Sequence, residues 1–254
     1  MSVFPLPDLA AHLRLAERLY RTHFFRVLPL YFALSLPYLL LEEFGPAWDL
    51  DVNPRTTLGV TSPWNVFAHM ARSLPAAYAL GYTARALGHS FSLRIKAAEQ
   101  VGLRLLSIVA YGVLNVAVWV GPFLLLTRNG NAHLLAALLA LLVSVFLSFT
   151  LSAVIIDDYS LLRGIGVSLC LVRNNLLRVL KYTLVAGLVA YVGLAFFGTL
   201  YGWLASSEWT RILRAETTSF PTALGFGWTF LESLASLYTS LFTALLYLSL
   251  KSEK

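Results

Sequence analysis

Charged residues and cysteine are scarce in this 254-residue sequence. Asp, Glu, Lys and Arg together make up 13% of the residues, about half the share found in soluble globular domains. This deficit excludes an ordinary soluble domain, and the apolar content of 58% points to a protein that lies in a lipid bilayer. The single cysteine, Cys170, excludes an intrachain disulfide and a cysteine-rich metal site.

Sequence motifs of catalytic and cofactor sites are missing as well. The chain has no phosphate-binding glycine loop, no zinc-ligand spacing and no serine elbow. We therefore expect a protein that is not an enzyme and that has no cofactor and no metal site. A short N-terminal apolar core with a small-residue cleavage site is also missing, so we expect no cleaved signal peptide.

Six apolar stretches are long enough to cross a bilayer, whose hydrocarbon core of about 30 Å requires roughly 20 helical residues. Backbone polar groups inside a bilayer must be satisfied within the segment, so each stretch is expected to be a helix. The sequence thus predicts an all-α polytopic membrane protein that forms one integral membrane domain over residues 1–254. The expected transmembrane helices cover residues 24–42, 63–84, 103–126, 134–156, 179–204 and 224–250.

Basic residues gather in alternate connections between these stretches, and this distribution predicts the orientation. Because cytoplasmic connections are enriched in Lys and Arg, the basic connections and both termini are expected in the cytoplasm. The net charge is +6. Because the basic residues lie beside apolar stretches, we expect anionic lipid headgroups and not nucleic acid as the partner. The residues expected on the cytoplasmic side are Arg14, Arg18, Arg21, Arg26, Arg85, Arg94, Lys96, Arg104, Arg163, Arg173, Arg178, Lys181, Lys251 and Lys254, whereas Arg55, Arg128, Arg211 and Arg214 lie on the other side.

Three basic segments that precede expected spans have the apolar spacing of amphipathic helices. Their apolar residues recur at steps of three and four, which places them on one helical face. Basic helices of this kind bind at the headgroup level of a membrane. The faces are formed by Leu161, Ile165, Leu169, Val172 and Leu176, by Leu87, Phe91, Ile95 and Ala98, and by Leu9, Leu13, Ala16 and Tyr20.

An internal repeat is indicated by two similar octapeptides. Residues 21–28 and 173–180 both have Arg at the first and sixth positions and end in Val-Leu, and residues 99–106 form a weaker copy. These copies predict three units of an interfacial helix followed by a hairpin, at residues 9–84, 85–156 and 157–250. The alternative is that the copies arose independently, because basic residues followed by aliphatic ones are common where a chain enters a membrane.

The segment 164–175 carries a family resemblance through Ser168, Leu171, Arg173 and Asn175. It resembles the membrane domain attached to some glycerophosphodiester phosphodiesterases in bacteria and archaea, and the uncharacterised stand-alone relatives of that domain. The resemblance covers nearly the whole chain and implies a six-span fold in a bacterial or archaeal plasma membrane. Gly164 stands where Ala is usual in that family, and the phosphodiesterase itself has no counterpart, since none of the five histidines is followed by Arg.

Two ionisable residues inside expected spans, Arg72 and Glu232, are predicted to lie at similar depth. A charge inside a bilayer costs several kcal/mol unless it is paired or hydrated, so we expect a mutual ion pair. His69 precedes Arg72 by about one turn, and Asn115 is a further candidate member of this intramembrane polar cluster. The cluster has two interpretations, a path or site for an ion, and a buried pair that orients the helices.

Two adjacent carboxylates, Asp157 and Asp158, follow the fourth expected span. A metal-binding aspartate motif would need a third carboxylate where Leu161 stands. We interpret both residues as caps for the helix that begins after Ser160, where they complement the helix dipole.

These observations predict a non-enzymatic integral membrane protein that acts as a scaffold, accessory subunit or membrane-homeostasis factor. Its basic cytoplasmic helices would bind anionic lipid headgroups or a protein partner, including a second copy of the chain. The alternative is a transporter or channel component that uses the polar layer of Arg72 and Glu232. The candidate cytoplasmic residues are Arg163, Ser168, Arg173, Asn175 and Arg178.

Overall fold

The computed structural model describes residues 8–44, 70–87, 97–126, 133–206 and 220–253. Within these ranges every regular element is an α-helix, which confirms the all-α prediction for this part of the chain. The helices are α1 (Leu9–Phe44), α3 (Ser73–Ala86), α4 (Ala97–Leu103), α5 (Leu105–Leu126), α6 (His133–Leu147), α7 (Thr150–Ile156), α8 (Leu161–Asn174), α9 (Leu176–Ser206) and α11 (Phe220–Ser252).

Three stretches of the described residues are long and apolar enough to cross a membrane. They are Leu135–Ile156, Leu176–Phe196 and Leu234–Ser252, which overlap the fourth, fifth and sixth expected spans. The prediction of six spans is therefore met for three of them within the described ranges.

The other three expected spans are described only in part, so they stay predictions. Residues 63–69 of the second expected span lie outside the described residues, and helix α3 covers its later part from Ser73 onward. Helix α5 has 22 residues, about 33 Å at 1.5 Å per residue, and the part of it with described side chains that is continuously apolar is Leu105–Val118. In α1 the expected span contains Pro29 and Pro37, and the side chains of its last residues lie outside those described.

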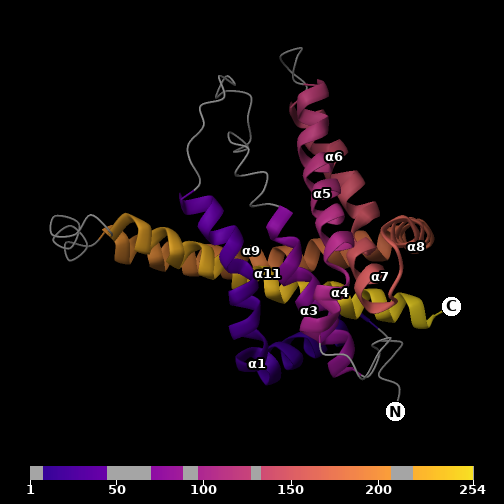
Figure 1. Cartoon of the computed structure of the whole chain (residues 1–254), viewed down its shortest axis with the longest axis horizontal. Helices are drawn as coiled ribbons and strands as arrows, with labels where there is room; N and C mark the ends of the chain where they lie inside the picture. Colours follow the sequence, from indigo (N-terminus) through magenta and orange to yellow (C-terminus); the bar gives the residue numbers. More distant parts are fainter. Residues whose placement is uncertain (1–7, 45–69, 88–96, 127–132, 207–219, 254) are drawn as a thin grey trace.

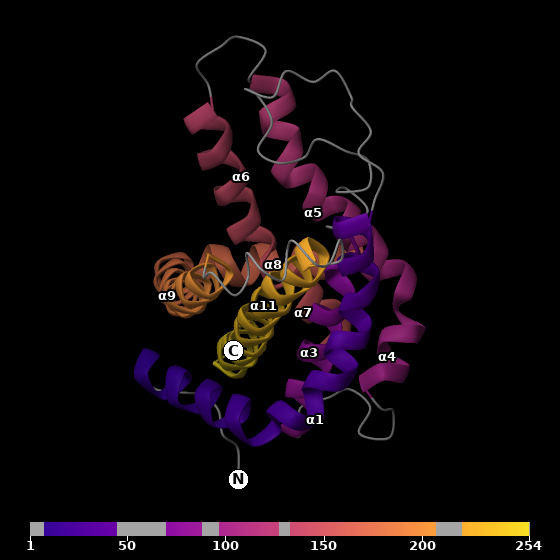
Figure 2. The ribbon, with the colours of Figure 1, turned by 90° about the vertical axis from the view of Figure 1, so that its left-hand side faces the viewer.

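Two helical hairpins project from a shared core (Figure 1). Helices α5 and α6 pack along each other, and α9 packs along α11. In Figures 1 and 2 the α5/α6 hairpin runs across the direction of the α9/α11 hairpin. This arrangement differs from the near-parallel bundle that six spans would form.

The core lies where α1, α3, α7 and α11 meet. Helix α11 packs against α1, α3 and α9, and every residue of α7 is buried. Because a helix that is apolar on all sides must be covered on all sides, α7 is enclosed by its neighbours while longer helices keep one open face. The segment before Asp157 is therefore held firmly within the core.

Close contact between α5 and the chain before α3 depends on Gly112. A Cβ atom built on Gly112 would lie 2.8 Å from the carbonyl oxygen of Met70 and 3.2 Å from Ser73 Oγ. Ser73 Oγ also donates hydrogen bonds to the carbonyl oxygens of Met70 at 2.6 Å and of Ile108 at 3.2 Å. The missing side chain thus allows Ser73 to link the two segments.

We predict that Gly112→Ala destabilises the protein by about 1–3 kcal/mol, because the added methyl group forces the backbone of Met70 to shift. The free energy of unfolding in detergent measures the effect. Gly102→Ala is the matched control, since a Cβ there meets nothing within 4 Å and replacing a helical glycine stabilises by about 0.5–1 kcal/mol. Equal behaviour of the two variants would contradict the close contact at Gly112.

Candidate functional site

Helix α8 is attached to the core by a face of small and aliphatic residues. Its buried residues are Gly164, Ser168, Leu171 and Val172. A Cβ atom on Gly164 would lie 3.1 Å from the carbonyl oxygen of Thr150, so the two helices approach each other closely there. The absence of a large side chain at this position allows α8 to lie against α7.

Ser168 fixes α8 to the interruption between α6 and α7. Its side chain is fully buried. The backbone N–H of Phe149 donates to Ser168 Oγ at 3.1 Å, and Ser168 Oγ donates to the carbonyl oxygen of Phe146 at 2.7 Å. Backbone groups released where one helix ends and another begins need new partners. Ser168 supplies two of them, so in this structure it supports the fold and does not belong to an exposed site.

The predicted apolar face of α8 is correct only in part. Val172 is buried and Ile165 is half-buried, but Leu169 and Leu176 are exposed. The spacing of large apolar residues predicted a buried face that is rotated around the helix axis from the face that is buried in the structure. Gly164 and Ser168 mark the true face, and their importance comes from close approach and hydrogen bonding rather than from hydrophobicity.

The opposite side of α8 is open and combines apolar with basic residues. Leu162 is 82% exposed, and Arg163, Leu169 and Arg173 are exposed as well. The guanidinium of Arg163 lies 4.2 Å from the centre of the Tyr159 ring, a cation–π contact that orients it. We call the exposed residues Leu162, Arg163, Leu169, Cys170 and Arg173 the open face of α8.

Asn175 separates α8 from α9. Its side-chain Nδ2 donates to the carbonyl oxygen of Leu171 at 3.1 Å, and α9 begins at the next residue. This contact satisfies a carbonyl group at the end of α8. Of the predicted cytoplasmic residues, Ser168 and Asn175 thus maintain the local backbone, while Arg163 and Arg173 lie on the open face.

Asp157 and Asp158 bind two different helices in a cluster of mostly ionic side chains that we call the charged junction. Asp157 accepts hydrogen bonds from Tyr247 and from Lys251 Nζ, the latter at 2.5 Å. Asp158 pairs with Arg104 at the start of α5, whose Nε lies 2.5 Å from Oδ1 and whose Nη2 donates to the Asp158 carbonyl oxygen at 3.0 Å. The charged junction consists of Arg104, Asp157, Asp158, Arg178, Tyr247, Lys251 and Glu253.

The interpretation of these two carboxylates as helix caps is wrong. Ser160 occupies the N-cap position of α8, and no side chain caps that end. Asp158 has a φ of 60°, the left-handed conformation that aspartate tolerates better than most residues. In this conformation both the carboxylate and the carbonyl oxygen of Asp158 bind the guanidinium of Arg104. A search of the described residues finds no cluster of three metal-ligating side chains.

Arg178 joins the start of α9 to the end of α11. Its Nη1 lies 2.7 and 2.6 Å from the two carboxylate oxygens of Glu253, and its guanidinium lies 5.5 Å from the centre of the Tyr182 ring. The predicted cytoplasmic residue Arg178 is therefore part of the charged junction and is separate in role from the open face of α8.

His12 is a buried polar residue that the sequence analysis missed. Its ring packs edge-on against Tyr182 with 5.0 Å between ring centres, and Nδ1 lies 2.8 Å from the Asp8 carbonyl oxygen. Nε2 is buried and has no hydrogen-bond partner among the described residues. Burial lowers the pKa of His12 below 6.5, and the nearby Arg178 lowers it further, whereas Asp8 and Glu253 oppose the shift. Its spacing from Ala16 and Leu19, at steps of four and three, is the signal that marks this buried face.

The intramembrane polar cluster is described only in part. Arg72 is half-buried just before α3, and Asn115 is half-buried in α5. The phenol of Tyr31 hydrogen-bonds with the Ser236 side chain, and Arg72 lies within electrostatic range of that phenol. His69 and the side chain of Glu232 lie outside the described residues, so their pairing with Arg72 stays a prediction.

A family model matches residues 82–250, the part of the chain that contains α8 and most of the charged junction. The family is described as a domain of unknown function, DUF7847. The chain belongs to this family. Membership agrees with the expectation of an uncharacterised family, and it makes no connection with the membrane domain of glycerophosphodiester phosphodiesterases. No curated protein and no solved structure is significantly similar to the chain.

We predict that Ser168→Ala lowers the free energy of unfolding by about 1–3 kcal/mol, because the buried N–H of Phe149 loses its acceptor. Chemical unfolding in detergent provides the measurement. Ser144→Ala is the control, since Ser144 Oγ donates to the Leu141 carbonyl oxygen of its own helix at 2.8 Å and does not bridge separate segments as Ser168 does. A loss at Ser168 no larger than that at Ser144 would show that the bridge is unimportant.

We predict that acidification below pH 6.5 loosens the N-terminal part of α1 from α9 and α11. The lowered pKa of His12 means that the packed state prefers the neutral ring, so stability is present above the unfolded-state pKa and is lost as the pH falls. The protection factors of residues 9–20 in hydrogen exchange, which are corrected for the intrinsic effect of pH on amide exchange, test this at pH 7.5 and 5.5, about one unit on either side of that pKa. His12→Phe should remove the pH dependence, while His23→Phe, which alters a histidine bonded to Tyr82 at 3.0 Å, should retain it.

Proposed function

We propose that the protein is a non-enzymatic integral membrane protein whose open face of α8 binds an anionic membrane surface. Many large apolar side chains of α5, α6 and α9 are exposed, and a soluble monomer rarely exposes such extensive apolar area. Lipid tails would cover these side chains without cost. Three helices with the length and hydropathy of a span support the same location.

The observation that carries the binding role is the division of α8 into two faces. One face is fixed to the core by Ser168 and Gly164, and the other presents Leu162, Arg163 and Arg173 to the surroundings. A helix that offers apolar and basic side chains together is suited to the boundary between headgroups and acyl chains. Its attachment to the core means that the helix does not have to fold on binding.

The wider role is part of the same proposal. We propose a scaffold, an accessory subunit or a membrane-homeostasis factor, with both termini on the cytoplasmic side of a bacterial or archaeal plasma membrane. The charged junction supports a common side for the ends of the helices, because it joins the start of α5, the start of α9 and the end of α11. The enrichment of Lys and Arg in the connecting segments favours the cytoplasm as that side.

Labelling of Cys170 in lipid nanodiscs tests the proposal. Cys170 lies on the open face, so contact with a membrane surface should slow its reaction with a bulky polar maleimide. We expect slower labelling in discs that contain phosphatidylglycerol than in discs of phosphatidylcholine alone. Each arginine near an anionic surface contributes about 1 kcal/mol, so the double variant Arg163→Glu, Arg173→Glu should abolish the difference.

The charge-retaining variant Arg163→Lys, Arg173→Lys is the control and should keep the lipid dependence. Arg178 is left unchanged in both variants because its substitution would break the pair with Glu253. Equal labelling of the native protein in both lipids would refute the role of the open face. If the Glu variant still labelled more slowly in phosphatidylglycerol, the lipid dependence would arise from a surface other than the open face of α8.

A transporter or channel component is the second candidate, and the position of Arg72 favours it. Arg72 is half-buried near Tyr31, whose partner Ser236 lies one helical turn after Glu232 in the sequence of α11. A polar layer between α1, α3 and α11 would result if Glu232 joined these residues. Ion flux into liposomes that disappears in Glu232→Gln would favour this function over the scaffold.

A further inference from the structure

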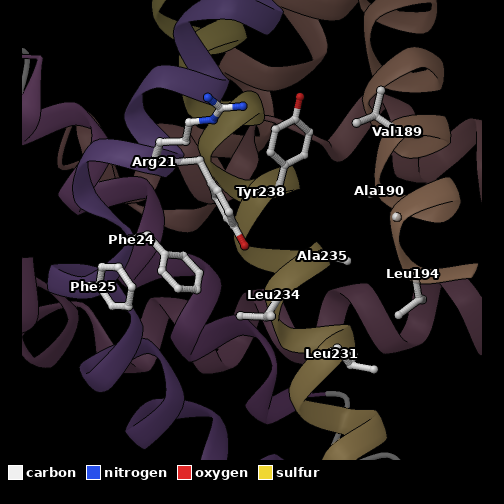
Figure 3. Close-up of a pocket in the computed structure, with 12 residues that line it drawn as sticks. Arg21, Phe24, Phe25, Val189, Ala190, Leu194, Leu231, Leu234, Ala235 and Tyr238 are labelled. Atoms are coloured by element: carbon white, nitrogen blue, oxygen red, sulfur yellow. The ribbon is translucent and has the colours of Figure 1, made fainter. Parts of the chain in front are cut away.

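A narrow groove of about 520 Å³ lies between α1, α9 and α11. Its volume falls within the range of about 300–1,000 Å³ typical of small-molecule sites. Figure 3 shows Phe24 and Phe25 on the α1 side, Leu234 on α11, and Val189 and Leu194 on the α9 side. The groove is lined almost wholly by carbon, so its occupant must be apolar over most of its length.

Small residues on two facing helices create the groove. Ala190 and Gly193 of α9 and Ala235 of α11 all line it. A Cβ atom built on Gly193 would meet nothing within 4 Å, which shows that the space beside this residue is open. Larger side chains at these positions would fill the space between α9 and α11. The sequence keeps the space open instead.

One end of the groove is polar and positively charged. Arg21 and the phenols of Tyr20 and Tyr238 belong to its lining, and Figure 3 shows Arg21 and Tyr238 toward one end and Leu231 toward the other. Tyrosine is favoured at the level of lipid headgroups. The groove thus has the polarity of a single phospholipid, with a cationic end and an apolar slot.

The charge beside this end favours an anion. Arg14, Arg18 and Arg21 follow one another at steps of four and three along an exposed face of α1. Glu17 pairs with Arg21 at 2.6 Å, but both side chains are mostly exposed. Exposed pairs of this kind are weak and screened by salt, so a phosphate group can replace the carboxylate. Of these arginines, Arg21 lines the groove and is the one placed to meet a phosphate group, whereas Arg14 lies two turns away along α1.

We propose that the groove binds one anionic phospholipid, with an acyl chain between α9 and α11 and the phosphate group beside Arg21. This inference rests on the proposed membrane location and adds a specific lipid site that is separate from the open face of α8.

Native mass spectrometry of the protein extracted from vesicles of phosphatidylglycerol and phosphatidylcholine tests the site. The native chain should retain one phosphatidylglycerol molecule after mild delipidation. Gly193→Leu should lose it, because the new side chain fills the groove. Gly187→Leu is the matched control, since Gly187 lies in the same helix with the same open surroundings but does not line the groove.

The headgroup contact has its own pair of variants. Arg21→Gln should weaken the preference for phosphatidylglycerol over phosphatidylcholine about fivefold, the loss expected for one basic residue near an anionic lipid. Arg14→Gln, which alters an arginine outside the groove, should retain the preference, and Arg21→Lys should restore it. Retention of the lipid by Gly193→Leu, or equal loss in Gly187→Leu, would show that bound lipid is only part of the surrounding annulus and would overturn the proposal.

The membrane location is measured separately, by whether carbonate washing leaves the native chain in the membrane fraction. A chain that stays in the membrane but retains no phosphatidylglycerol would refute the lipid site and leave the proposed function standing. A chain released by carbonate would refute both.

Discussion

Two adjacent carboxylates hold the ends of three helices together. Asp157 binds Lys251 and Tyr247 of α11, while Asp158 binds Arg104 at the start of α5, and both follow directly from the buried α7. Each ion pair at a surface contributes little to the free energy of unfolding. These pairs nevertheless bring specific helix ends together. Because every residue of α7 is buried, Asp157 and Asp158 at its end are held in place. The helices that bind these two carboxylates are positioned relative to α7.

Open apolar faces and buried small residues explain the rest of the architecture. Helix α9 leaves most of the aliphatic side chains that the structure describes in it uncovered, while α7 and α8 approach each other through Gly164. In lipid, exposed aliphatic groups carry no penalty, and close packing of small residues becomes a main source of helix association. The same use of small residues at Ala190, Gly193 and Ala235 produces a groove where the helices do not close completely.

The sequence predicted the helical class and the existence of α8 because both depend on local patterns of apolar residues. It did not correctly predict which face of α8 is buried. The spacing of leucines carries no information on the hydrogen bond from the Phe149 N–H to Ser168 Oγ, which holds the buried face against the break between α6 and α7. The pairing of Asp157 with Lys251 spans 94 residues of sequence, and its partners could not be chosen from local spacing. The break between α6 and α7 was also missed, because residues 134–156 read as one continuous apolar stretch.

The arginines of this protein fall into two groups, those paired with a carboxylate inside the molecule and those exposed at its surface. Arg104 and Arg178 are bound by carboxylates of distant segments, so their charge is largely compensated within the molecule. Arg163 and Arg173 lie on the open face of α8, and Arg14 and Arg18 lie on the exposed face of α1. An anionic surface would gain most from these exposed arginines, because long-range attraction depends on charge that no internal partner has neutralised. In the proposed function, the exposed arginines of these two helical faces would therefore make the contact, whereas Arg104 and Arg178 maintain the framework that presents them.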